Sequence, residues 1–206
     1  MNRHVHPSVE TYTGQLVDLL NPNPATIYLQ DVAWALARQA RFNGHTHGVW
    51  PYSVAQHSVL VAQILERQGF AAQTIVQGLL HDAHEAYVGD VVSPVAHLSR
   101  SIKKVLDQAK SVLQAAIHQS LEVPEVLPHA ARQIGEADRM ALAIEAHHLM
   151  ASKGRAWEPL REIDRGAFED LRHLFRKPMS PQEAYQDFWL AFHTLKGGFT
   201  LQALCA

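Results

Sequence analysis

Hydrophobic residues recur at intervals of three and four positions over most of the chain, which is the spacing of amphipathic helices. The clearest stripe extends through residues 102–117 and predicts a helix that begins at Ser99. The same spacing, together with start and stop residues, predicts five more helices, over residues 31–42, 53–69, 71–87 and 130–152 and from residue 180 onward. Helices are therefore expected to form most of the protein.

Several of these helices have recognisable residues at their ends. Ser53 is followed three residues later by Gln56, and Ser180 is followed by Glu183, so both serines are expected to begin a helix with a capping box. Asp31 is expected to cap the first helix through its side chain.

The segment before the first helix differs in character. Residues 11–30 contain Gly14 and "NPNP", which favour turns, so a short strand or hairpin is expected there. Six helices and one hairpin indicate an all-α bundle. We expect a single domain over residues 1–206, with a core of about residues 30–152 and a C-terminal helical extension of about residues 156–206.

Composition narrows the class of protein. The net charge of -2 gives no basic footprint, so no nucleic-acid polymer is expected as a partner. The single cysteine, Cys205, excludes an intramolecular disulfide and fits a reducing cytosol. No apolar run approaches the roughly 20 residues that span a bilayer, and the N-terminus lacks the apolar core of a secretory signal. A soluble, cytoplasmic protein without membrane contact is expected.

Polar residues interrupt the hydrophobic stripes of three predicted helices. His57 lies on the buried stripe of the second helix. His81 and Glu85 share a face of the third helix, and Asp82 is adjacent to them. Asp138 interrupts the apolar stripe of the fifth helix in the same way. Imidazole and carboxylate groups from three helices are therefore expected to point inward.

Such an arrangement needs a chemical explanation, because burying an unpaired charge costs several kcal/mol. Helical bundles build metal sites from side chains of this kind on facing helices. Two imidazoles and two carboxylates suit one divalent transition ion (Mn, Co, Fe, Ni or Zn) better than Ca or Mg. A second interpretation stays open, in which His57 is a hydrogen-bonded core histidine and Asp138 pairs with a neighbouring arginine. At least half of the 14 histidines are expected at the surface.

Two further residues on these faces are expected to support the cluster. Gly78 lies on the face of His81 and would let a neighbouring helix approach closely. Glu145 shares the face of Asp138 but lies about 10 Å farther along the helix. Glu145 is therefore expected to support a pocket rather than to bind a metal.

The order of these residues resembles that of the HD-domain phosphohydrolases. The motifs are "RFNGH" from Arg41, "YSVAQHSVLVA" from Tyr52, "LLHDAHEAYVGDV" from Leu79 and "EADRMALAIEA" from Glu136. They are similar to those of bacterial and phage HD-domain 5'-deoxynucleotidases, and of the deoxynucleoside triphosphohydrolases of phages that replace adenine with 2-aminoadenine. The resemblance extends over residues 11–145 and implies an HD-domain helical bundle.

The resemblance also implies roles for single residues. One divalent metal would be held by His57, His81, Asp82 and Asp138. Glu85 and Asp90 would act on water and leaving group, and Arg41 would bind phosphate. These roles agree with the chemistry of the groups, since a guanidinium matches phosphate geometry and a nearby carboxylate can orient or deprotonate water.

The residues expected near the substrate match the family less closely than the expected metal ligands do. Some nucleotidases of this group have tryptophan where this chain has Phe42, a position expected near the sugar or base. His45 resembles a family position near the substrate. His84, inside "HDAHEAY", has a helical position that points it away from His81 and Glu85, so it is expected at the surface or behind the metal ligands.

The resemblance, together with these residues, leaves four functions open. The leading expectation is hydrolysis of the 5'-phosphate ester of a deoxynucleoside monophosphate, and the alternative is release of triphosphate from a deoxynucleoside triphosphate. A (p)ppGpp hydrolase is disfavoured, because those enzymes usually have "ED" where this chain has "HEA". A non-catalytic metal-binding module would tolerate loss of Arg41, Glu85 or Asp90, and all three are present. A small-molecule nucleotide is the expected partner. The apolar C-terminal "FTLQALCA" indicates docking of the tail or a subunit contact, and a homo-oligomer is expected.

Overall fold

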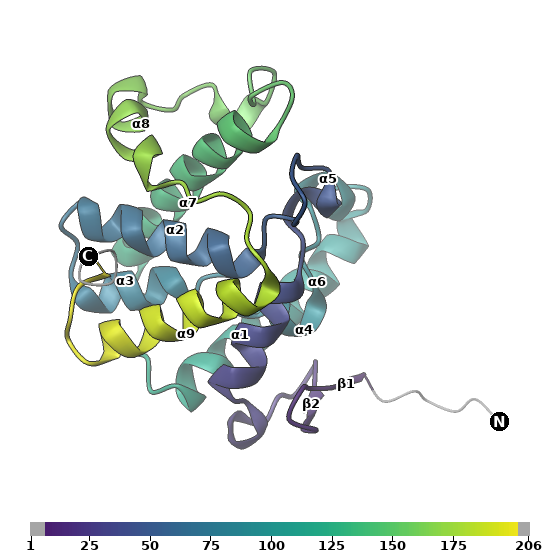
Figure 1. Ribbon diagram of the computed structural model, residues 1–206. Helices are drawn as coiled ribbons and strands as arrows, with labels where there is room; N and C mark the ends of the chain where they lie inside the picture. The colour runs from purple at the N-terminus through teal and green to yellow at the C-terminus, as the bar shows by residue number, and fades with distance from the viewer. Residues whose placement is uncertain (1–6, 202–206) are drawn as a thin grey trace.

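The computed structural model describes residues 7–201, in which a short hairpin is followed by nine α-helices (Figure 1). The strands β1 (Ser8–Glu10) and β2 (Leu16–Asp18) pair antiparallel, with Val9 opposite Val17. The α-helices are α1 (Leu29–Arg38), α2 (Val54–Arg67), α3 (Ala72–Leu79), α4 (Glu85–Val88), α5 (Ser93–Ala96), α6 (Arg100–Ser120), α7 (Pro128–Leu149), α8 (Arg165–Leu171) and α9 (Pro181–Lys196). The 3-10 turn η1 (Pro24–Thr26) precedes α1, and three more lie between α-helices, η2 (Arg41–Gly44), η3 (Glu158–Leu160) and η4 (Arg172–Leu174). The expected all-α fold with an N-terminal hairpin is confirmed, and Cys205 lies outside the described residues.

Helix α2 lies at the centre of the fold and contacts α1, α3, α7 and α9 (Figure 1). Its buried residues lie on all sides of the helix, from Val54 to Leu65, as expected for a helix surrounded by others. The close contact with α3 depends on Gly78, because a Cβ added there would lie 2.2 Å from Leu65 Cδ1. The prediction that Gly78 admits a neighbouring helix is therefore confirmed.

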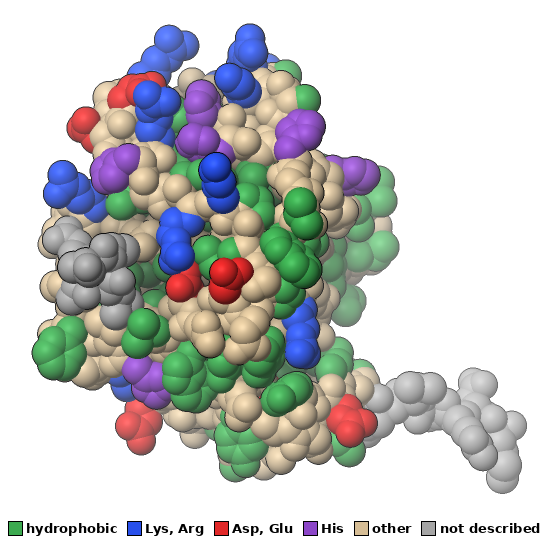
Figure 2. All heavy atoms as spheres, viewed as in Figure 1, with side chains coloured by type: hydrophobic (Ala, Val, Ile, Leu, Met, Phe, Trp, Pro, Cys, Tyr) green, Lys and Arg blue, Asp and Glu red, His purple; other side chains and the backbone are tan. Residues whose placement is uncertain are grey.

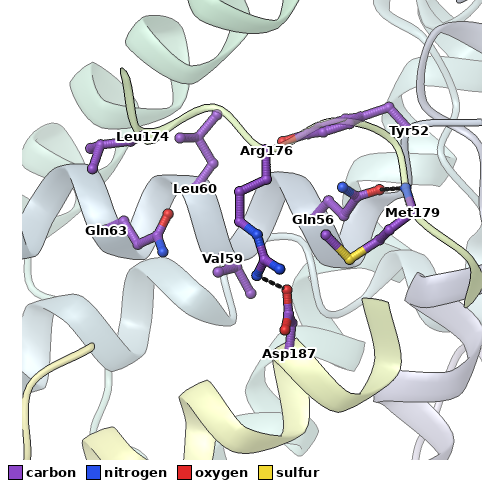
Figure 3. Close-up of a pocket in the computed structure, with 9 residues that line it drawn as sticks. All are labelled: Tyr52, Gln56, Val59, Leu60, Gln63, Leu174, Arg176, Met179 and Asp187. Carbon is purple, nitrogen blue, oxygen red and sulfur yellow. Dashed lines mark hydrogen bonds and ion pairs between the residues drawn. The ribbon is translucent and has the colours of Figure 1, made fainter. Parts of the chain in front are cut away.

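The C-terminal helix α9 contributes to the same core and is fastened to α2 by polar contacts. Phe188 of α9 is fully buried. The side-chain amide of Gln56 donates to the carbonyl of Lys177 at 3.0 Å and accepts from the backbone N–H of Met179 at 3.4 Å. Arg176 pairs with Asp187 beside these contacts, as the close-up in Figure 3 shows. The segment before α9 is therefore held against the first turn of α2.

The predicted capping boxes are both present. The Ser53 hydroxyl accepts from the backbone of Gln56, and the Gln56 side chain accepts from the backbone of Ser53. Ser180 and Glu183 make the same pair of hydrogen bonds at the start of α9. Both helices consequently begin where the sequence predicts.

The prediction for the first helix was wrong at both ends. Asp31 does not cap α1; it lies inside the first turn, where its carboxylate accepts from the backbone and hydroxyl of Thr13 at 2.8 and 2.7 Å. The helix ends at Arg38 rather than near residue 42, because the next residues are extended and Ala40 forms an antiparallel bridge with Ser53. Tertiary pairing with the hairpin and with the start of α2 therefore outweighs the local signals.

The predicted helix over residues 71–87 is interrupted. It divides into α3 and α4, and the residues between them form tight turns with bonds such as Ala83 N–H to the Leu80 carbonyl. The break is compensated, because the carbonyl of Gly78 accepts from the His81 ring and that of Leu80 accepts from the side chain of Gln114. Side chains thus satisfy carbonyl groups that a continuous helix would bond internally.

Among the residues that the structure describes, no helix combines the length and apolar character needed to cross a lipid bilayer.

Candidate metal centre

Four potential ligand atoms meet where α2, the turn after α3 and α7 come together. The Nε2 atoms of His57 and His81 lie 3.3 Å apart. The Asp138 carboxylate lies 3.1 Å from His57 Nε2 and 3.9 Å from His81 Nε2. The Asp82 carboxylate lies 3.6 and 3.1 Å from the same two nitrogens. The structure therefore brings together all four residues for which metal binding was expected.

The spacing of these atoms fits a divalent ion. Ligands that bind an ion at about 2.0–2.2 Å with tetrahedral or octahedral angles are separated from one another by about 3.0–3.6 Å. The measured separations of the carboxylates from the ring nitrogens, 3.1 to 3.9 Å, lie close to this range. His57 is fully buried, whereas the side chain of Asp138 is 42% exposed. His57, His81 and Asp138 could thus hold a metal ion that remains accessible from the side of Asp138, and Asp82 lies beside both histidines.

Hydrogen bonds on the opposite ring nitrogens orient both histidines. Nδ1 of His57 donates to Glu145 at 2.6 Å, and Nδ1 of His81 donates to the carbonyl of Gly78 at 2.8 Å. A neutral ring that is protonated at Nδ1 presents a lone pair at Nε2, so the two lone pairs face each other and two carboxylates. Such an arrangement is favourable when a cation lies between them, and a carboxylate behind a histidine is a common support for a metal ligand.

The pKa shifts of these residues also show that the cluster favours positive charge. Burial and the nearby Arg41 oppose protonation of His57, yet Glu145 and Asp138 outweigh them and raise its pKa to about 10. Burial also disfavours the charged form of His81, but Asp82 raises the pKa of this histidine above its ordinary value. The pKa of Asp82 itself is held well below the usual range, because the two histidines outweigh its desolvation. The cluster therefore stabilises a cation, either a proton or a metal ion.

Glu145 has a more direct role than its sequence position indicated. Its side chain is completely buried and accepts from His57 with one oxygen and from Arg41 Nε, at 2.9 Å, with the other. Arg41 comes from the η2 turn, 104 residues away in the chain. Glu145 thus supports the site, as expected, by connecting the buried histidine to the arginine expected to bind phosphate.

The turn that contains His81 and Asp82 is held by Gln114 of α6. The side-chain amide of Gln114 donates to the carbonyl of Leu80 at 2.7 Å, and its oxygen accepts from the backbone N–H and the Nδ1 of His84 at 3.3 and 3.0 Å. His84 is buried rather than exposed, so of the two expected placements the one at the surface was wrong. The role of Gln114 was missed, because nothing near it in the sequence resembles a motif.

Glu85 and Asp90 lie beside the cluster. Burial, with the charges of Asp82 and Asp90, raises the pKa of Glu85 to about 8, although Lys110 and Arg41 oppose this shift. Burial also raises the pKa of Asp90, while Arg41 lowers it. Glu85 contributes to a second potential ligand group with Asp82 and His84, whose ligand atoms lie within 4.8 Å of one another. Lys110 of α6, which the sequence did not single out, lies 3.6 Å from Glu85.

Aromatic residues flank Arg41 on its outer side. The guanidinium carbon of Arg41 lies 5.3 Å from the ring centre of Phe42, and the Phe42 ring lies 5.9 Å from that of Trp157. Phe42 has a positive φ of 56°, an uncommon conformation for this residue type. His45 ends the same turn with an exposed side chain, and no hydrogen bond or ion pair joins it to the four-residue cluster. Phe42 and Trp157 therefore form an aromatic wall next to Arg41.

Histidine content alone would not have located this cluster. Figure 2 shows histidine side chains at the surface near the end of the molecule where α7 and α8 lie. The exposed histidines within residues 7–201 are His45, His47, His97, His129, His148, His173 and His193.

The chain is similar to two curated bacterial proteins. It is 38% identical over 140 residues to an uncharacterized protein of Rhodobacter capsulatus, with 66% of this chain and 70% of that protein covered. It is 30% identical over 187 residues to the uncharacterized protein YfdR of Escherichia coli, with 91% of this chain and 94% of YfdR covered. No protein-family model matches the chain. The chain therefore belongs to the same protein family as these two relatives.

Proposed function

We propose that this protein is a metal-dependent phosphohydrolase of deoxynucleotides, which hydrolyses the 5'-phosphate ester of a deoxynucleoside monophosphate to nucleoside and phosphate. The observation that supports this most is the convergence of His57, His81, Asp82 and Asp138 from three distant segments, with both imidazoles aimed inward. The same residues, in the same order along the chain, underlie the resemblance to the HD-domain phosphohydrolases.

The donor set supports one divalent transition ion, Mn, Co, Fe, Ni or Zn, as the cofactor. The chemistry that such an ion supplies when bound is polarisation of a phosphoryl oxygen and activation of water near neutral pH. The protein's own contribution is to orient the two Nε2 atoms toward the ion, through Glu145 behind His57 and the Gly78 carbonyl behind His81.

The surrounding residues have complementary tasks in this proposal. Glu85, with a pKa raised to about 8, can take up a proton from water, since a base is most effective when its pKa lies near the working pH. Burial raises the pKa of Asp90 while the charge of Arg41 lowers it, and Asp90 would act at the leaving group. Arg41 binds the phosphate, held in position by Glu145. The wall of Phe42 and Trp157 is where the base or sugar would pack, and His45 would approach the substrate from the exposed end of the η2 turn.

A nucleotide panel tests the proposal. The purified protein, loaded with Mn or Co, is incubated with deoxynucleoside monophosphates, deoxynucleoside triphosphates and ppGpp, and the released phosphate species are identified by chromatography. We expect orthophosphate from a monophosphate. Release of triphosphate would establish the alternative function, and release of pyrophosphate from ppGpp would establish the signalling-nucleotide hydrolase. Failure to hydrolyse any nucleotide while a metal is tightly bound would reject the phosphohydrolase and favour a non-catalytic metal-binding module.

Related expectations remain predictions of the same proposal. A small-molecule nucleotide is the substrate, no nucleic-acid polymer takes part, and the protein works in the cytoplasm as a homo-oligomer. Light scattering coupled to gel filtration would measure the oligomeric state.

A further inference from the structure

His84 has a buried ring nitrogen without a bonding partner. The residue is 8% exposed, and its Nε2 makes no hydrogen bond to any described residue. The other ring nitrogen, Nδ1, lies 3.0 Å from Oε1 of Gln114. The orientation of this amide is fixed, because its nitrogen donates to the Leu80 carbonyl at 2.7 Å. Oε1 therefore accepts from Nδ1, and Nε2 presents a lone pair.

Two carboxylates lie close to the His84 ring. Asp82, His84 and Glu85 each offer one ligand atom, and these atoms lie within 4.8 Å of one another. Oε2 of Glu85 is buried and, within residues 7–201, also has no hydrogen-bond partner. Oδ2 of Asp82 faces His57 and His81, which leaves its Oδ1 for another cation. Acceptor atoms gathered in this way are unfavourable unless a cation lies among them.

Lys110 of α6 satisfies only part of this group. Its ammonium lies 3.6 Å from Oε1 of Glu85, which is longer than a hydrogen bond between an ammonium and a carboxylate. Oε2 of Glu85 and Nε2 of His84 stay without a partner in the part of the chain that the structure describes. The side chains of Asp82 and Lys110 are 20% and 27% exposed, so an ion can reach the group from solvent.

We propose that Asp82, His84 and Glu85 form a second divalent-metal site, which binds its ion more weakly than the four-residue cluster and inhibits hydrolysis when it is filled. One imidazole and two carboxylates suit a transition ion such as Mn. The inhibition rests on the proposed function, in which Glu85 takes up a proton from water, because a carboxylate bound to an ion no longer does so. Binding of the ion does not depend on that function.

Three features make the second ion the more weakly bound one. The group has three ligands, of which Asp82 is shared with the four-residue cluster. The limit of 4.8 Å between its ligand atoms is wider than the about 3.0–3.6 Å expected around a bound ion, so the side chains must first move together. The charges of Lys110 and of the first ion repel a further cation. Scarce metal therefore fills the first site alone, and excess metal fills both.

Titration with the metal alone counts the sites. Mn is titrated calorimetrically into the metal-free protein and into H84N, E85Q and H118Q. Asparagine keeps an N–H near Nδ1 for Gln114 but has no atom at the position of Nε2, and E85Q removes the charge while keeping the shape. His118 also contacts Gln114, at 2.9 Å, but lies outside the ligand group, so H118Q is the control. Electron paramagnetic resonance detects the magnetic coupling of two Mn ions that share Asp82.

We expect the unmodified protein and H118Q to bind two Mn ions per chain, the second about 10- to 100-fold more weakly than the first. H84N and E85Q should bind one ion, with an affinity within about three-fold of the first site, and show no magnetic coupling. Melting curves identify a variant that does not fold, and the other variant then decides. A single ion in the unmodified protein at saturating Mn would overturn the site, as would a second ion of undiminished affinity in either folded variant.

Hydrolysis tests the inhibition separately. Phosphate release from deoxynucleoside monophosphates is measured with one equivalent and with excess Mn, and each protein is compared with itself. We expect excess Mn to slow the unmodified protein by about 10-fold or more and to leave the rate of H84N unchanged. An undiminished rate of the unmodified protein with both ions bound would overturn the inhibitory role. Absence of any nucleotide hydrolysis would reject the proposed function, and the inhibitory role with it, but not the second metal site.

Discussion

Glu145 and His57 are joined by a hydrogen bond of 2.6 Å between two side chains that are completely buried, one on α7 and the other on α2. The carboxylate fixes which ring nitrogen of His57 has the proton, and therefore which nitrogen faces the metal cluster. The same carboxylate also holds Arg41. A single residue thus orients one expected metal ligand and the expected phosphate-binding group.

Replacing Glu145 by glutamine should weaken metal binding without removing a ligand. The amide can accept from His57 or face Arg41, but it offers only one oxygen where the carboxylate uses two. We expect the affinity for Mn or Co to fall by about 10- to 100-fold, as measured by calorimetry. Unchanged metal affinity in Glu145→Gln would show that this support is unnecessary.

Substitution of the expected ligand Asp82 and substitution of the neighbouring Glu85 should affect metal content and activity differently. Asp82→Ala removes one of the four converging groups and is expected to abolish both bound metal and hydrolysis. Glu85→Ala is expected to keep the metal and lose activity. Metal is measured by elemental analysis after gel filtration, and hydrolysis by phosphate release. Activity retained by either variant would contradict the assigned roles.

Gln114→Leu should loosen the turn that contains His81 and Asp82. The variant removes the donor to the Leu80 carbonyl and the acceptor for His84, so a buried carbonyl is left without its partner. We expect a loss of about 1–3 kcal/mol in the free energy of unfolding, together with weaker metal binding. Gln108→Leu, at an exposed position of the same helix, is the matched control, and denaturant titration measures both. Equal stability of the two variants would refute the bridging role of Gln114.

Gly78→Ala should destabilise the protein through overpacking. The new methyl group would lie 2.2 Å from Leu65 Cδ1, and Leu65 is fully buried, so the contact between α2 and α3 must open. We expect a loss of about 1–3 kcal/mol in the free energy of unfolding. Gly135→Ala, where a Cβ meets nothing within 4 Å, should be neutral or slightly stabilising. A similar midpoint of unfolding for both variants would disprove this reading of the helix contact.

The protein should become less stable as the pH is lowered, because of His118. Burial lowers the pKa of this histidine, and its Nε2 lies 2.9 Å from the side-chain amide nitrogen of Gln114, which leaves no acceptor there for a second proton. The unfolded chain takes up a proton as pH falls below about 6.5 while the folded protein resists it, so the free energy of unfolding decreases in that range. Denaturant titrations between pH 7.5 and 5 should show a shallower loss in His118→Gln. His129→Gln, at the surface, should follow the unmodified protein, and parallel curves for all three would rule out the effect.

Much of the fold could be predicted from the chain because its signals are local. The capping boxes at Ser53 and Ser180 involve residues three positions apart, so short-range hydrogen bonds decide them. The buried faces of His57 and Glu145 followed from helical periodicity. Asp31 misled the prediction because its partner, Thr13, belongs to the hairpin, and sequence patterns do not reveal such a contact.

The sequence by itself determined which side chains face inward, and hence that imidazole and carboxylate groups would have to meet in the core. Only the tertiary structure decided how they meet. The bridge from Gln114 to Leu80 joins residues 34 apart, and the bond between His57 and Glu145 joins residues 88 apart. The approach of Lys110 to Glu85 likewise depends on the packing of α6 against α4. Periodicity specifies the direction of a side chain around its own helix, whereas the packing of several helices sets the distances between side chains and therefore the chemistry of the site.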